Sequence, residues 1–382
     1  MKLISICFLL LLSSTAFSVP NWTQRADFAG GGRHRANSFQ IGTKGYLGIG
    51  HYNGTGVNIV LKDWWEYDPS TNAWTQKADY IGNNGNGNYG SLSFSFDNEA
   101  YLGGGALGVS DFYKYTPSTN TWTPVTPPPI KPSDTQGFVI GDSGYFIRFG
   151  TLWEYNRNND QWANRGTVPF FVNGWNSGFS INGKGYIKTG NQLWEYKPLT
   201  NQWAMRTSFP GLATGGSGAF IQNGKAYIVT GYAGSLSSVN SEIWEYNPNS
   251  NSWWQYANFP GTSRRFSCTF NVGNKAFIST GTSGTNFSDL WEFNLVVGLN
   301  DLSYDNSFTA YPNPAKEKIR FQSEQYSNAL IKIYSIDGNL VKEIKMISNQ
   351  VTFYRENIQN GTYFYHVEVE NQIIHTNKFI FI

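Results

Sequence analysis

The chain has 382 residues, of which 17% are aromatic and only 14% are charged, and it contains 41 glycines. Its 28 lysines and arginines nearly balance 26 aspartates and glutamates, and no long run of one sign occurs. The sequence therefore indicates neither a nucleic-acid-binding face nor a basic membrane-surface helix. Abundant aromatic residues and glycine are typical of many short strands joined by tight turns.

The first eighteen residues have the pattern of a signal peptide. Lys2 provides the positive start, residues 3–12 form an apolar run, and Ala16-Phe17-Ser18 offers small residues for cleavage before Val19. The run is short for a bilayer and no other apolar stretch is longer, so we expect an exported mature chain without a transmembrane helix. After cleavage, Cys268 is the only cysteine, which excludes an intramolecular disulfide and predicts a packing residue.

An internal repeat occupies the chain from residue 20 to residue 294. Two aromatic residues separated by one position recur six times, and in five copies a tryptophan follows nine positions after the first of them. The intervening turn, as in Asp68-Pro69-Ser70-Thr71-Asn72, has proline where φ is preset and asparagine where positive φ is tolerated, which predicts a hairpin. The aromatic pairs are Trp65/Tyr67, Tyr113/Tyr115, Trp153/Tyr155, Trp194/Tyr196, Trp244/Tyr246 and Trp291/Phe293, and the tryptophans are Trp74, Trp122, Trp162, Trp203 and Trp253.

Two further strand-like segments precede each aromatic pair. Residues 44–50 (KGYLGIG), 184–190 (KGYIKTG) and 225–231 (KAYIVTG) match one another, and a short alternating segment such as residues 38–41 comes before each. Four strands at a period of roughly 40 to 52 residues are typical of propeller blades. These segments resemble Kelch repeats, which implies an all-β fold with a six-bladed β-propeller. The double glycine usual in that family is clear only at residues 103–105, and the third and fourth repeats are abbreviated.

The two ends of the repeat region complement each other. The sixth aromatic pair lacks its tryptophan, whereas residues 21–26 (NWTQRA) closely match residues 73–78 (AWTQKA) of the first repeat. We therefore predict that the N-terminal strand completes the last blade, which also protects a strand edge. The predicted boundaries are a signal peptide at 1–18, the propeller at 19–297, and a linker with a C-terminal β-domain at 298–382.

The residues after the linker alternate as short strands. Residues 331–335 and 340–344 flank Asp337-Gly338, a tight-hairpin dipeptide, and residues 361–367 and 378–382 complete a predicted small antiparallel β-sandwich. Together with Tyr311-Pro312-Asn313-Pro314, these segments resemble the C-terminal sorting domain of the type IX secretion system of Bacteroidetes, subtype A. The resemblance implies export through the periplasm by the type IX machinery, followed by release or attachment to the cell surface. An ordinary immunoglobulin-like accessory domain is the alternative.

One face of the predicted propeller is the expected binding region. Connections from each outermost strand to the next innermost strand share this face with the loops between the two middle strands, and loops on rigid scaffolds carry function. On this chain the face gathers long segments that we expect to be irregular. They include residues 30–35, 51–62, 83–89, 127–134, 170–176, 232–241 and 263–266.

Ring closure predicts a cluster of cations on that face. Arg33, His34 and Arg35 open the first blade and Arg264 and Arg265 open the sixth, so closure would make them neighbours. Paired guanidinium donors suit carboxylates or phosphates, which predicts an anionic or acidic-sugar ligand. The alternative is structural, because Kelch repeats often carry an arginine before the inner strand. Candidate sugar-stacking residues on the same face are Tyr52, Tyr89, Trp175 and Tyr232.

Catalysis has less support in the residues. The Kelch resemblance implies a copper oxidase acting on galactose as a candidate activity, because the family includes such an enzyme. That chemistry needs a cysteine cross-linked to tyrosine and two histidine ligands. The propeller offers only Cys268, His34 and His51, without a matching motif. A sugar mutarotase would need an acid or base beside the arginines, and no loop carboxylate stands out. We therefore predict no catalytic residue, metal or cofactor, and a module that binds glycan or protein. The alternative is a carbohydrate-active enzyme, either a mutarotase or a galactose-oxidase-like protein.

Overall fold

The computed structural model describes residues 19–172, 175–296, 308–335, 340–369 and 372–382. The predicted signal peptide and the Asp337-Gly338 turn lie outside them. Contacts divide the chain into two compact units, of which one spans Pro20–Asn294 and the other contains Leu295–Ile382. The described residues are almost entirely strand and turn, apart from the short 3-10 helix η1 (Asn83–Gly85), and none of their helices is long and apolar enough to cross a bilayer.

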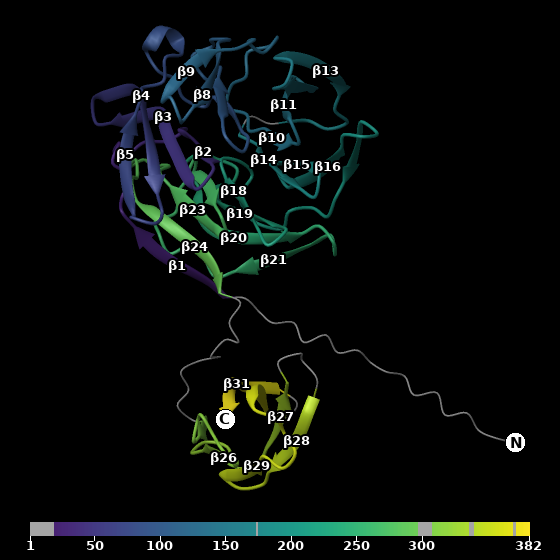
Figure 1. Ribbon diagram of the computed structural model, residues 1–382. Coiled ribbons are helices and arrows are strands. Elements are labelled where there is room, and N and C mark those ends of the chain that lie inside the picture. Colours follow the sequence, from purple (N-terminus) through teal and green to yellow (C-terminus); the bar gives the residue numbers. More distant parts are fainter. Residues whose placement is uncertain (1–18, 173–174, 297–307, 336–339, 370–371) are drawn as a thin grey trace, which may run out of the picture. The chain divides into compact units, whose positions relative to one another are not determined.

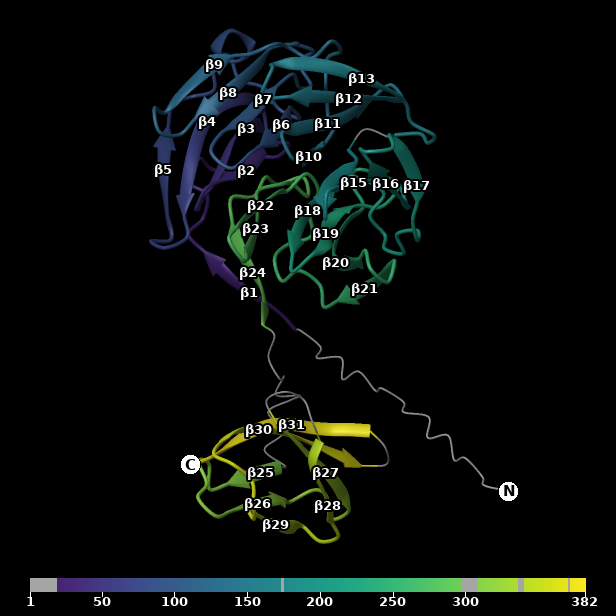
Figure 2. The ribbon, with the colours of Figure 1, turned by 45° about the vertical axis from the view of Figure 1, so that its right-hand side comes forward.

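The larger unit consists of six four-stranded antiparallel sheets, each of which is a blade (Figures 1 and 2). Five blades use four consecutive strands each. In every one of them the first strand lies at the central channel of the propeller and the fourth lies at the outside. They are β2 (Asn37–Ile41), β3 (Lys44–Gly54), β4 (Val57–Asp68) and β5 (Ala73–Lys77) in blade 1; β6 (Leu92–Ser95), β7 (Ala100–Gly103), β8 (Phe112–Thr116) and β9 (Thr121–Pro124) in blade 2; β10 (Phe138–Ile140), β11 (Ser143–Arg148), β12 (Thr151–Asn156) and β13 (Gln161–Thr167) in blade 3; β14 (Ser177–Ile181), β15 (Lys184–Thr189), β16 (Gln192–Lys197) and β17 (Gln202–Met205) in blade 4; and β18 (Gly218–Gln222), β19 (Lys225–Tyr232), β20 (Val239–Asn247) and β21 (Ser252–Tyr256) in blade 5.

Blade 6 joins the two ends of the propeller. Its sheet has the order β1-β24-β23-β22, with β22 (Cys268–Val272), β23 (Lys275–Ser279) and β24 (Leu290–Val296) followed by the N-terminal β1 (Val19–Arg25). The Trp22 ring packs edge-on against Phe259 and Phe293, with centroids 5.1 and 4.9 Å away. The innermost strands contact one another in the order β2, β6, β10, β14, β18 and β22, and β22 also contacts β2. The predicted six-bladed fold, completed by the N-terminal strand, is confirmed.

The recurrent side chains bind four of the blades to the blade before them. In blade 1 the Tyr67 hydroxyl donates to Oδ1 of Asn72 (2.8 Å), which also accepts the backbone N–H of Ala26 (2.9 Å), and the Trp74 indole donates to the Ala26 carbonyl (3.1 Å). The same pair of links to the preceding blade recurs in blades 2, 3 and 5. Asn72 has φ 54°, which asparagine tolerates better than most residues. The repeat spacing therefore reflects packing between blades.

One segment differs from the predicted pattern. Residues 51–62, expected to be an irregular loop, belong mostly to the hairpin of β3 and β4, which pair as far as Gly54 and Val57. These strands are 11 and 12 residues long. The hairpin therefore extends blade 1 as regular structure.

The C-terminal unit is a small sandwich of two antiparallel sheets. One sheet contains β25 (Phe308–Tyr311), β26 (Lys318–Ser323) and β29 (Gln350–Tyr354), and the other has β28 (Leu340–Met346), β27 (Ala329–Tyr334), β30 (Gly361–Val369) and β31 (Gln372–Phe381) in that order. Phe321 and Phe353 from the first sheet share one buried core with Ile331, Tyr365 and Phe379 from the second. The predicted sandwich is confirmed.

Candidate functional site

Six residues form a ring around one end of the channel, where the chain enters the innermost strand of each blade. All six line a single pocket and have a left-handed backbone, with φ between 52° and 71°. From the second to the sixth, the backbone N–H of each donates to the carbonyl of the one before it, at 2.7 to 3.0 Å. We call this set the mouth ring; its members are Arg35, Gly90, Asp134, Trp175, Gly216 and Phe266.

Four members of the mouth ring carry side chains, and this backbone disfavours all of them except aspartate, which tolerates it better. Left-handed φ suits glycine, whereas another residue there costs about 1–2 kcal/mol. The hydrogen bonds around the ring come from the backbone alone, so glycine would satisfy them at every position. The hydrogen bonds of the ring therefore do not require the side chains of arginine, aspartate, tryptophan and phenylalanine at these positions. Backbone strain of this kind points to a functional site.

The two glycines of the mouth ring make room for their neighbours. A Cβ atom at Gly90 would lie 2.0 Å from Oδ1 of Asp134, and a Cβ at Gly216 would lie 2.9 Å from the Phe266 ring. Both distances are too short for real contacts, so a side chain at either glycine would displace the neighbouring one. Ring positions with and without side chains therefore work together to shape the pocket.

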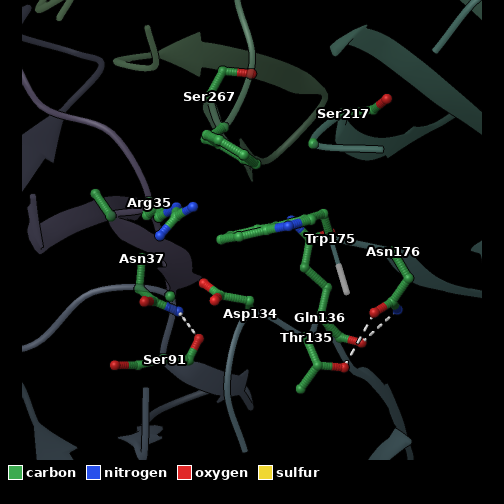
Figure 3. A pocket seen from close by; sticks show the side chains of 14 residues that line it. Arg35, Asn37, Ser91, Asp134, Thr135, Gln136, Trp175, Asn176, Ser217 and Ser267 are labelled. Carbon is green, nitrogen blue, oxygen red and sulfur yellow. Dashed lines mark hydrogen bonds between the residues drawn. The ribbon is translucent and has the colours of Figure 1, made fainter. Parts of the chain in front are cut away.

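Arg35 lies close to three aromatic rings in this pocket. Figure 3 shows its guanidinium next to Trp175, at 3.9 Å from the ring centroid. Phe266 and Tyr89 lie 5.0 and 5.7 Å from the same group. Burial lowers the pKa of Arg35, although an arginine remains charged. Its Nε has no hydrogen-bond partner within the described residues. The result is a fixed cation with unused donor capacity.

Asp134 is a carboxylate that the sequence analysis missed. Burial raises its pKa to about 6, against the opposing influence of Arg35 and Arg148. Its Oδ1 is buried and has no partner in the described part of the chain. The expectation that no loop carboxylate lies beside the arginines is therefore wrong. A group that titrates near pH 6 next to a fixed cation can bind a polar ligand or exchange a proton with it.

The wall below the mouth ring is polar. Asn37 Nδ2 donates to the Ser91 carbonyl (2.8 Å), and the Thr135 hydroxyl donates to Oδ1 of Asn176 (3.1 Å), as Figure 3 shows. Including the part open to solvent, the pocket encloses about 470 Å³, within the usual range for small-molecule sites. The remaining wall residues are Ala36, Gln136, Ser217 and Ser267.

Two of the predicted arginines do not face the pocket. Arg33 and Arg264 are both 0% exposed. Arg33 donates through both terminal nitrogens to Asp63, at 2.6 and 2.9 Å, and to the Ile49 carbonyl (3.0 Å). Arg264 makes the same contacts with Asp289 and the Thr280 carbonyl. The prediction that they bind a ligand is wrong and the structural alternative holds, because a half-buried carboxylate partner in each blade already uses their donors.

The other predicted residues surround the mouth ring at different depths. His34 is buried, with Nε2 3.2 Å from Nδ1 of His51, and desolvation lowers its pKa to about 4, so it is neutral near pH 7. Tyr89 stacks on His51, and Tyr232 lies beside Phe266. Arg265 donates to the Leu236 carbonyl, and its charge lowers the pKa of Arg35. Tyr52 lies in the β3–β4 hairpin opposite Ile59, away from the residues that line the pocket.

The described residues of this face do not form a group of side chains able to bind a metal ion. Within the described residues, no group of three or more histidines, cysteines, aspartates or glutamates is positioned to hold a metal ion. Cys268 is buried, and desolvation raises the pKa of its thiol to about 11. A thiol of this kind is a packing residue rather than a nucleophile.

Comparison with known proteins concerns the two units separately. Residues 309–382 match the family model of the secretion system C-terminal sorting domain. The C-terminal unit is a type IX sorting domain. The protein is therefore exported, to be secreted or held at the cell surface, and the sorting domain interacts with the type IX machinery. The chain is also similar to the solved structure of YjhT, a β-propeller, with a TM-score of 0.58 at 14% identity, covering 70% of this chain and 95% of that one. At this identity the similarity shows the fold alone. No curated protein matches the chain in sequence.

Proposed function

We propose that the propeller is a Kelch-type recognition module that binds an anionic glycan in the mouth-ring pocket, and that the sorting domain delivers it outside the cell. One observation carries this proposal. Arg35 is held against Trp175 and Phe266 at a strained backbone position, with donor capacity that no described residue uses. Strain and desolvation retained together are the signature of a binding residue.

The chemistry of the pocket favours a charged sugar over a protein surface. A guanidinium presents paired donors to a carboxylate or sulfate, while the aromatic rings of Trp175 and Tyr89 beside it offer apolar surface for a sugar ring. The Gln136 side chain lines the same cavity and supplies an amide group suited to hydroxyls, whereas the Asn37 and Asn176 amides shape the wall through bonds within the protein. Protein interfaces are broader and have a less polar centre.

Binding of acidic glycans to the full chain tests the proposal. A glycan array followed by calorimetry should detect acidic sugars, and Arg35→Ala should lower the affinity about tenfold or more. Arg157→Ala is the matched control, because Arg157 lines a pocket at the opposite end of the innermost strands. Equal affinity in the Arg35 variant and the wild type would refute the site. Binding only to neutral glycans or to proteins would refute the ligand class.

Asp134 favours a second candidate, a carbohydrate-active enzyme that interconverts sugar anomers. A carboxyl group with a pKa near 6 can accept the proton of an anomeric hydroxyl and return a proton to the ring oxygen, with no net change in protonation. Saturation-transfer NMR on reducing acidic sugars should then show faster anomer exchange with the protein, lost in Asp134→Asn. Stable binding without faster exchange favours the recognition module.

A further inference from the structure

The loops that surround the mouth ring are short on one side of the propeller face. In blades 3 and 4, only residues 149–150 and 190–191 connect the two middle strands. The corresponding connections in blades 2, 5 and 6 run over residues 104–111, 233–238 and 280–289, and in blade 1 the strands themselves extend the hairpin. A ligand longer than the pocket therefore meets least obstruction over blades 3 and 4.

A groove follows this side and adjoins the mouth-ring pocket, with which it shares two lining residues. Thr135 and Asn176 line both the groove and the pocket. The groove encloses about 870 Å³, including the part open to solvent, so it exceeds the pocket itself. Its outer walls are mainly apolar and are formed by Ile147, Phe149, Phe170, Phe171 and Val172.

Two phenylalanines of the groove are exposed without a structural reason. Phe149 and Phe171 are 79% and 80% exposed. Phe149 also has φ 48° in a two-residue turn, where asparagine or glycine is normally favoured. The matching turn of blade 4 has glycine, Gly190, at φ 55°. Phe149 therefore combines an exposed apolar ring with an unfavourable backbone, and the fold gains from neither.

A cation accompanies these rings. The Arg148 guanidinium lies 4.5 Å from the Phe149 ring centroid, and one terminal nitrogen donates to the Ser133 carbonyl (3.1 Å). Its Nε is buried and lacks a hydrogen-bond partner in the described residues. Arg148 and Arg35 both act on the Asp134 carboxyl, so the positive charge of the pocket continues into the groove. Aromatic rings with adjacent cations suit a chain of acidic sugars.

We propose that the groove is an extension subsite for an acidic oligosaccharide. The terminal unit occupies the mouth-ring pocket, and the following units cross blades 3 and 4, stacked on Phe149 and Phe171 with Arg148 beside their acidic groups. The assignment of the terminal unit rests on the proposed function, whereas the groove adds a dependence on chain length. The protein would thus recognise the end of an acidic polysaccharide together with the units next to it.

Calorimetry with oligogalacturonates and chondroitin sulfate oligosaccharides of increasing length, together with galacturonic acid, tests this subsite. In the full chain, affinity should rise about tenfold or more between the shortest and longest members of the series that binds. Phe149→Asn/Phe171→Ala should abolish this rise and leave the affinity for the shortest member within about twofold. Trp254→Ala, which removes an exposed aromatic ring from the outermost strand of blade 5, is the matched control and should keep the rise.

The outcomes separate the subsite from the proposed function. Arg35-dependent binding of the shortest sugars without any gain from length refutes the groove alone. A length dependence that survives in the double variant refutes it too, because other residues then bind the added units. Failure of all acidic sugars to bind refutes both proposals. The double variant is expected to fold, since asparagine suits the turn at residue 149 better than phenylalanine does.

Discussion

The outer part of each blade and the mouth ring use the sixfold repeat in opposite ways. In the outer part the side chains repeat, so that the tyrosine, asparagine and tryptophan of blade 1 have counterparts with the same bonds in other blades. In the mouth ring only the backbone repeats, and the six residues include two glycines, two charged residues and two aromatic residues. Side chains that repeat serve the fold. Side chains that differ on a shared backbone are free to serve a ligand.

Two arginines only two residues apart show the same contrast. Arg33 is buried and its pairing with Asp63 is copied by Arg264 and Asp289 in blade 6. Arg35 has no copy, because glycine, aspartate, tryptophan or phenylalanine takes its place in the other blades.

Deleting residues 21–26 should have the largest effect, because it opens the ring. The deletion removes the outer strand of blade 6 and uncovers Phe259 and Phe293, against which Trp22 packs. We expect a loss of more than about 4 kcal/mol in the free energy of unfolding, measured by denaturant titration of the propeller. Arg25→Ala, which removes only the bond to Glu292, is the control and should cost much less. Equal stability of the deletion and the full chain would mean that β1 does not close the ring.

Exchanging Arg33 and Arg35 separately for alanine should divide stability from binding. Arg33→Ala leaves the Asp63 carboxylate facing a buried gap and should cost about 3–5 kcal/mol. Arg35→Ala keeps the Cβ atom and with it the left-handed strain, so it should change stability by less than about 1 kcal/mol, while it lowers the affinity for acidic glycans about tenfold or more. Thermal unfolding and calorimetry on the same samples measure both effects. A similar loss of stability in both variants would contradict the distinction.

Lys188 is a buried cation too, but it has no carboxylate partner within the described residues. Its ammonium lies 4.5 Å from the Phe209 ring and donates to the Ala213 carbonyl, as Arg33 lies over Phe28. Desolvation lowers the pKa of Lys188 from 10.5 to about 7. The unfolded chain then binds more protons between those values, so stability rises with pH across that window.

Lys188→Met should remove this dependence. Below pH 7 the variant should be more stable than the wild type by about 1–3 kcal/mol, because a buried charge is replaced by an apolar chain of similar length. Near pH 10.5 the two proteins should converge. Unfolding titrations over this pH range measure the difference. A constant difference at every pH would mean that Lys188 does not titrate within the window.

The sequence predicts the fold well because the fold depends on side chains that must recur. Asn72 and Trp74 bind the preceding blade through their own functional groups, and the Tyr67 hydroxyl fixes Asn72, so residues able to make these bonds recur at a constant spacing. The unmatched strand at residues 21–26 then reveals ring closure. The hairpin at residues 51–62 escapes prediction because its strands extend past the repeated segment and their exposed residues do not alternate in polarity.

The site was only partly predictable for the opposite reason. The mouth ring shares φ angles and backbone hydrogen bonds, which leave no common residue type in the sequence. Arg35 and Trp175 were identified from their place in the loops, but Asp134, Phe149 and Phe266 were not. A spacing pattern in the sequence does distinguish the structural arginines. Arg33 and Arg264 each follow a phenylalanine by five positions, and Asp63 and Asp289 each precede a tryptophan by two. That shared pattern marks both arginines as part of the repeat.

Asp134→Asn should give a small change in stability that depends on pH, and it links the stability of the folded chain to the chemistry of the pocket. Because burial raises the pKa of Asp134 from 3.8 to about 6, the folded protein binds more protons than the unfolded chain between these values, and stability falls as pH rises through them. Above pH 6 the variant should therefore be more stable than the wild type by about 1–2 kcal/mol, and below pH 3.8 the two should be alike.

The same substitution should strengthen the binding of a sulfated glycan above pH 6, because it removes a negative charge beside Arg35. A sulfate keeps its charge over this range, so any pH dependence belongs to the protein. In the wild type, affinity should rise as pH falls through 6, and in the variant it should stay level. Calorimetry at several pH values separates the two. A wild-type affinity that does not change with pH would mean that the Asp134 carboxyl does not face the ligand. Asp134 would then not belong to the binding site.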